Sequence, residues 1–174
     1  MAKVPMKYEI NLSIVHLMDY LLNSTGLVIV IYGCSDPRTW RYVLEKAEEI
    51  EVMFPNAKIA PIVVPGGGKS LMDDPFSDAA KEAINKIRVV MRKIKAEKLF
   101  MIFLPHEDCG DYDELKLSRE GLNSHFGKQA RIVPETLKNE FGEKLLGVIT
   151  SIIHLDENNK NIVGETGLGG VIIV

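Results

Sequence analysis

The sequence has no excess of basic residues, no long apolar run and few cysteines, and each shortage excludes a class of protein. Lysine and arginine number 21 against 24 aspartates and glutamates, which gives a formal net charge of -3. Nucleic acids and anionic lipid surfaces are bound through a surplus of positive charge. No apolar stretch approaches the roughly 20 residues that a membrane-spanning helix needs. We therefore expect no nucleic-acid partner and no membrane association.

The N-terminal segment also lacks the apolar run that follows the lysines of a secretory signal. We therefore expect a cytoplasmic protein. In a reducing compartment the two cysteines, Cys34 and Cys109, are poor candidates for a structural disulfide. Free cysteines can be small buried hydrophobes, but thiols in such proteins are often metal ligands or catalytic groups.

The 174 residues fit one domain, and no repeat, low-complexity segment or linker divides them. Short apolar runs predict strands over residues 27–32, 58–64, 99–104 and 145–155, with shorter ones at 162–163 and 171–174. Apolar residues at helical spacing predict helices over residues 8–22, 40–53, 78–95 and 134–141. This alternation predicts a single α/β domain over residues 1–174, with an open, mainly parallel sheet flanked by helices.

Ligand-binding loops of such a sheet follow the carboxyl ends of the strands. Three predicted strands run into Gly-Cys-Ser-Asp-Pro-Arg at 33–38, Pro-Gly-Gly-Gly-Lys-Ser at 65–70 and Pro-His-Glu-Asp-Cys-Gly at 105–110. Both cysteines and one of the four histidines therefore fall at the same edge of the sheet. His125 and His154 have no companions of ligand type at close spacing, and His16 lies one residue off the apolar stripe of the first predicted helix, so we expect all three to be ordinary.

Thiolate and imidazole groups bind zinc tetrahedrally, and three protein ligands leave the fourth position open. Cys34, His106 and Cys109 supply such a set. His106 and Cys109 can hold one ion from a single tight loop, whereas Cys34 reaches it only if the first and third predicted strands are neighbours. Asp36 and Arg38 add a carboxylate beside a guanidinium, which can form a bidentate pair. Asp36 would close the fourth position by binding the metal, and Arg38 would hold it back.

The segments Cys-Ser-Asp-x-Arg at 34–38 and His-x-Asp-Cys-Gly at 106–110 together resemble the two signature motifs of the β-class carbonic anhydrases. The resemblance implies that the domain binds Zn²⁺ through Cys34, His106 and Cys109. It implies a catalytic dyad of Asp36 and Arg38, and the reversible hydration of carbon dioxide to bicarbonate by zinc-bound hydroxide, a lyase reaction. It also implies a homodimer or a larger homo-oligomer.

The likeness runs from about residue 27 to 110 and more loosely to 146–155, and this chain departs from the family in two places. The family usually carries Arg-Asn-Ala-Gly after the second strand, where this chain has Val-Pro-Gly-Gly at 64–67. The acidic segment 111–114 also has no counterpart that we can align. We therefore expect a divergent member.

Three alternatives remain open. A related enzyme could hydrolyse carbonyl sulfide or carbon disulfide, and a non-catalytic relative could use the metal, closed by Asp36, only to brace the fold. A nucleotide-binding protein could use Lys69 and Ser70, but the phosphate-binding motif needs glycine where this chain has Val63. We expect the glycines at 66–68 to permit close backbone approach to neighbouring loops instead.

Overall fold

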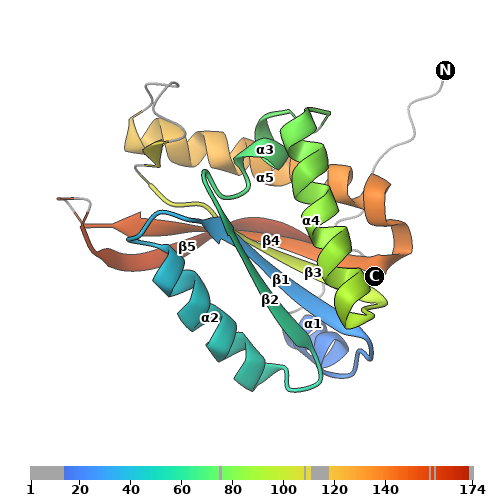
Figure 1. Ribbon diagram of the computed structural model, residues 1–174. Coiled ribbons are helices and arrows are strands. Elements are labelled where there is room, and N and C mark those ends of the chain that lie inside the picture. Colours follow the sequence, from blue (N-terminus) through green and yellow to red (C-terminus); the bar gives the residue numbers. More distant parts are fainter. Residues whose placement is uncertain are drawn as a thin grey trace.

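The computed structural model describes residues 14–74, 76–107, 109–110, 118–156, 158 and 160–172, and contains a five-stranded sheet with helices on both faces (Figure 1). The strands are β1 (Leu27–Cys34), β2 (Lys58–Val64), β3 (Lys98–Leu104), β4 (Leu145–Leu155) and β5 (Ile162–Ile172). The helices are α1 (Ile14–Leu22), α2 (Trp40–Met53), α3 (Lys69–Asp73), α4 (Asp78–Ile94) and α5 (Arg119–Phe141), with a 3-10 turn η2 (Gly142–Lys144). The predicted α/β class is confirmed.

The strand order is β2-β1-β3-β4-β5, so β1 lies between β2 and β3. β1 pairs in parallel with β2 and β3, β3 pairs in parallel with β4, and β5 runs antiparallel to β4. The sheet is thus mainly parallel, as predicted. The first and third strands are neighbours, with Gly33 opposite Leu104 at their carboxyl ends.

All eight residues of β1 are buried because helices cover both faces of the sheet. Alternate β1 side chains point to opposite faces, so Val28 and Val30 join the core under α4 and α5, whereas Ile29 and Ile31 pack against α1 and α2. Figure 1 shows α1 and α2 on one side of the sheet and α3, α4 and α5 on the other. No helix among the described residues is long and apolar enough to cross a membrane.

The prediction that the last helix covers only residues 134–141 was wrong, because α5 already begins at Arg119 and contains Pro134 in its interior. Proline lacks the amide hydrogen that an interior helical position donates, so it favoured a helix start there. Packing of α5 in the core keeps the helix continuous through Pro134 despite this local preference. The buried side chains of α5 recur every three or four positions, at Leu122, Phe126, Ala130, Val133, Leu137 and Phe141.

The prediction of two short C-terminal strands was also wrong. One strand, β5, runs from Ile162 to Ile172, although its sequence is rich in glycine, and its ladder with β4 shifts register twice. Pairing along β4 holds this strand despite its weak sequence signal. The short helix α3 was not predicted either. Positions 8–13 of the predicted first helix and positions 173–174 lie outside the described residues.

Candidate metal centre

The predicted ligands come together where β1 and β3 end. Cys34 is the last residue of β1, and His106 lies just beyond the end of β3. The loop after β3 continues along β4, since the Ile153 amide donates to Pro105 (2.8 Å) and the Glu107 amide donates to Ile153 (3.1 Å). This extension keeps the loop at the carboxyl edge of the sheet.

Cys34, His106 and Cys109 each direct one ligand atom into a common space. These three atoms lie within 4.8 Å of one another, and the two sulfur atoms are 3.8 Å apart. The side chains are almost inaccessible, with exposures of 3%, 0% and 3%. A group of two thiols and an imidazole at these separations is able to hold a metal ion.

The hydrogen bonding of His106 suits it to bind a metal through Nε2. Its Nδ1 lies 2.7 Å from the carbonyl oxygen of Glu107, and because a carbonyl only accepts, Nδ1 carries the hydrogen. In the neutral ring Nε2 then holds a lone pair. That atom is buried and has no hydrogen-bond partner among the described residues. Buried polar atoms are normally satisfied, so an unmatched lone pair facing two thiols fits a metal ligand.

The surroundings of Cys34 favour its thiolate form. The neighbouring Cys109 thiol contributes most to holding the pKa of Cys34 well below its usual range, although burial acts in the opposite direction. His106 and the backbone amide of Asp36 lower this pKa further. The thiolate is the form of cysteine that binds metals, so the site presents an ionised sulfur.

Asp36 and Arg38 form the predicted bidentate pair at the mouth of the site. Arg38 donates from Nη2 to Oδ2 of Asp36 (2.6 Å), from Nε to Oδ1 (2.9 Å) and from its backbone amide to Oδ1 (2.8 Å). The side-chain hydrogen bond from Arg38 is the largest cause that lowers the pKa of Asp36 to about 2. Oδ2 of Asp36 also lies 3.9 Å from Nε2 of His106, so an ionised carboxylate stands beside the three ligands.

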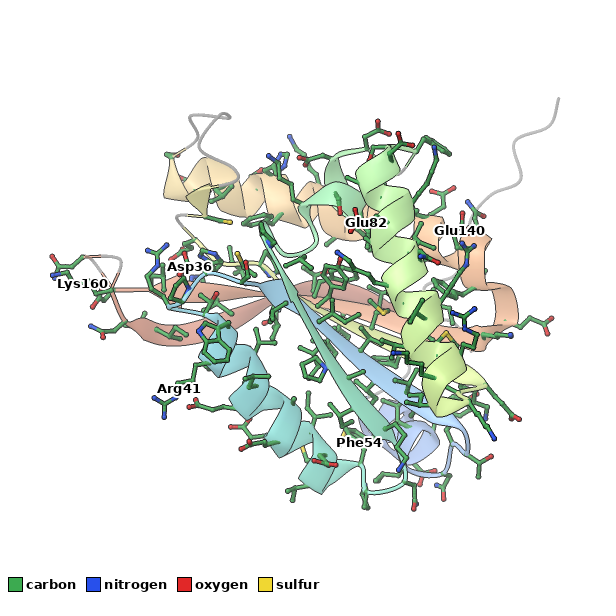
Figure 2. All side chains as sticks on the ribbon, viewed as in Figure 1. Asp36, Arg41, Phe54, Glu82, Glu140 and Lys160 are labelled. Atoms are coloured by element: carbon green, nitrogen blue, oxygen red, sulfur yellow. The ribbon has the colours of Figure 1, made fainter. Side chains whose placement is uncertain are left out.

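Local structure explains why Asp36 lies there. Its carbonyl oxygen accepts hydrogen bonds from the amides of Thr39 and Trp40, both at 2.9 Å, in the turn that begins α2. The loop after β1 is thereby fixed against the start of the helix. In Figure 2 the labelled Asp36 lies on this loop, beside the loop that follows β3.

The glycine-rich loop after β2 packs against the backbone of Cys34. Gly67 has a φ of +56°, and a Cβ atom there would lie 3.3 Å from the Cys34 amide nitrogen. The Ser35 amide donates to the Val64 carbonyl at 2.9 Å, which joins the two loops directly. At Gly67 the expected close backbone approach is thus confirmed.

Reasoning from the sequence missed one buried carboxylate. Glu107, between two of the predicted ligands, is only 2% exposed and contacts His154, which was expected to be ordinary. The only signal in the sequence was a charged residue inside the His-x-x-Cys loop, and nothing in the sequence linked it to His154, which is 47 residues away.

His125 lies near Asp73 of α3, with Nε2 and Oδ1 3.5 Å apart. Asp108 and the acidic segment 111–114 lie outside the described residues.

Comparison with models of protein families and with curated proteins found no match for this chain.

Proposed function

We propose that the protein is a zinc-dependent lyase of the carbonic anhydrase type, which interconverts carbon dioxide and bicarbonate on a β-carbonic-anhydrase-like fold. One observation carries the proposal: the Asp36–Arg38 pair stands directly beside a buried group of Cys34, His106 and Cys109. The three ligands would hold the ion, because two thiolates and one imidazole form a donor set that zinc prefers. We further propose that the protein is cytoplasmic and works as a homodimer or a larger homo-oligomer.

A zinc ion with three protein ligands supplies Lewis-acid activation of water, which gives a nucleophile at neutral pH. Asp36 is the residue placed to orient that nucleophile. Since its pKa is about 2, it is ionised at neutral pH and acts only as a hydrogen-bond acceptor. A carboxylate that accepts the hydrogen of the attacking group directs the remaining lone pair toward the substrate carbon.

Arg38 keeps Asp36 available for this role. Both carboxylate oxygens are engaged by the guanidinium, so the carboxylate is held in one orientation beside the ligands rather than among them. The burial of the ligands restricts the substrate to a very small molecule. Carbon dioxide meets this condition, and so do carbonyl sulfide and carbon disulfide.

The experiment combines elemental analysis with stopped-flow kinetics. Protein purified under reducing conditions is assayed for zinc, and hydration of carbon dioxide is then measured for the wild type, Asp36→Asn and Cys34→Ser. We expect about one zinc per chain in the wild type and in Asp36→Asn, loss of zinc in Cys34→Ser, and hydration only in the wild type.

Each other outcome has a defined meaning. Zinc without hydration, but with hydrolysis of carbonyl sulfide or carbon disulfide, would move the reaction to that substrate. Zinc with none of these activities would leave a structural site. Reduced wild-type protein that binds no metal would refute the proposal entirely.

A further inference from the structure

Glu107 is a buried acid that the proposed reaction does not use. Its carboxylate accepts hydrogen bonds from Nδ1 of His154 at 3.0 Å and from the Leu155 amide at 3.2 Å. The exposure of its side chain is 3%, against 26% for His154. Both partners belong to β4, whereas Glu107 belongs to the loop after β3. The carboxylate therefore ties that loop to the neighbouring strand.

The backbone of the same residue acts directly on the candidate metal ligand. The Glu107 carbonyl oxygen accepts from Nδ1 of His106 at 2.7 Å, which leaves Nε2 of that ring as the lone-pair atom. The position of the Glu107 carbonyl therefore decides where Nε2 points. The residue is held by the hydrogen bond from its backbone amide to the Ile153 carbonyl and by the side-chain contacts to β4.

Packing alone does not account for a carboxylate at this position. A buried acid is costly unless it is paired and hydrogen-bonded, and an apolar side chain of similar size would fill the space at lower cost. A carboxylate, unlike an apolar side chain, accepts hydrogen bonds from two donors at once, and these two bonds fix the orientation of Glu107. Residues that fix a metal-binding histidine from behind commonly use such contacts.

We propose that Glu107 and His154 form a positioning pair for the metal centre, which fixes the direction in which His106 presents Nε2. The inference rests on the proposed metal site but not on carbonic anhydrase activity. His154 is the outer member of the pair, and Glu107 is the inner member that joins it to the ligand loop.

The test uses Co²⁺ as the probe, because its absorption reports both thiolate ligation and the geometry of the site. Binding to the reduced, metal-free chain is measured by competition with a chelator, and the spectrum is recorded at saturation. The variants are His154→Leu, Glu107→Ala, the double variant and His154→Asn, whose amide keeps a donor near the position of Nδ1. Ile50→Ala is the control, since Ile50 is a core residue near the far end of α2.

We expect His154→Leu and Glu107→Ala each to weaken Co²⁺ binding by about 10- to 100-fold, in line with other contacts behind metal ligands. The ligand-field bands at saturation should also change. The double variant should be no weaker than Glu107→Ala, because the two residues act through one contact. His154→Asn should recover most of the affinity and the wild-type spectrum, and Ile50→Ala should alter neither.

His154 is partly exposed, so His154→Leu and its rescue by asparagine test the pair even if Glu107→Ala does not fold. Wild-type affinity and an unchanged spectrum in His154→Leu would overturn the positioning role while leaving the metal site intact. An equal loss in Ile50→Ala would also overturn it, since the effect would then reflect stability alone. A wild-type chain that binds no Co²⁺ or Zn²⁺ would instead defeat the metal site itself.

Discussion

The sulfur atoms of Cys34 and Cys109 lie 3.8 Å apart although 75 positions separate the residues in the chain. This distance is well above the sulfur–sulfur bond length of about 2.05 Å, so the thiols are not bonded. It is short enough for one zinc ion to contact both, because each Zn–S bond is about 2.3 Å long. The pairing of β1 with β3 creates this arrangement, since it joins the two loops at one edge of the sheet.

The first prediction is that the metal-free protein forms a Cys34–Cys109 disulfide when it is incubated with dilute hydrogen peroxide, an oxidant small enough to reach buried thiols. The sulfur atoms need to approach by less than about 2 Å. The low pKa of Cys34 supplies the thiolate that peroxide oxidises to a sulfenic acid, with release of hydroxide. The Cys109 thiol then attacks the sulfenic sulfur and displaces water to form the disulfide. Intact-protein mass and thiol titration measure the reaction.

Zinc added before the oxidant should protect both thiols, because ligation engages the sulfur atoms. Cys109→Ser should stop at the sulfenic acid of Cys34, because the second thiol that would displace water is missing. If the metal-free wild type kept both thiols free under these conditions, the short sulfur–sulfur distance would not describe the protein in solution.

The central strands and their helices could be predicted because each carries a complete local signal. β1 is buried on both faces and reads as a continuous apolar run, and α2 has the bounds that its apolar spacing predicts. The N-terminal half of α5 could not be predicted in this way. It includes Gly121 and Gly127, which disfavour a helix locally, and packing against the sheet supplies the stability that the local sequence lacks.

The juxtaposition of the candidate ligands could also be predicted, because residue type and strand-end position are both visible in the sequence. The contact between Glu107 and His154 could not. It depends on the register between the loop after β3 and β4, including the bridge between His106 and Ile153. A register between distant segments is set by tertiary packing, which no spacing rule reveals.

The second prediction concerns Arg38→Ala, which removes the side-chain donors that hold Asp36. We expect carbon dioxide hydration to fall by at least about 10-fold, as for other contacts behind a metal site. Zinc affinity should be unchanged or higher, because the released Asp36 carboxylate would become a ligand. Stopped-flow kinetics and chelator competition measure the two effects.

Arg38→Lys is the matched control, since it keeps the charge but loses the forked geometry. Its activity should lie between those of Arg38→Ala and the wild type. Full activity in Arg38→Ala would contradict the role assigned to the pair.

The third prediction uses two glycines with the same backbone angle. Gly67 and Gly142 both have a φ of +56°, but a Cβ atom at Gly67 would meet the Cys34 backbone, whereas nothing lies within 4 Å at Gly142. Alanine at either position should lower the free energy of unfolding by about 1–3 kcal/mol, because a positive φ is strained for a residue with a side chain. Only Gly67→Ala should also weaken zinc binding, because it displaces Cys34.

Chemical denaturation of the metal-free proteins and chelator competition separate the two effects. Equal zinc affinities in the two variants would mean that the loop after β2 does not support the position of Cys34.

The last prediction is a loss of stability at high pH that depends on Tyr32. This side chain is 1% exposed, and burial, followed by the charge of Glu82, raises its pKa from 10.0 to about 12. The unfolded chain ionises this phenol above pH 10, whereas the folded chain does so only near pH 12. The neutral form therefore contributes stability that is complete below pH 10 and is lost as the pH rises toward 12, by about 2–3 kcal/mol.

Tyr32→Phe removes the hydroxyl and keeps a ring that can pack against Phe103, whose centroid lies 5.6 Å away. The difference in unfolding free energy between wild type and Tyr32→Phe should therefore change between pH 10 and pH 12, as measured by urea denaturation. The variant should also lack the part of the tyrosinate absorbance that develops near pH 12. Parallel stability curves for the two proteins across this range would show that the pKa of Tyr32 is not raised, and that its hydroxyl is not enclosed between the sheet and α4.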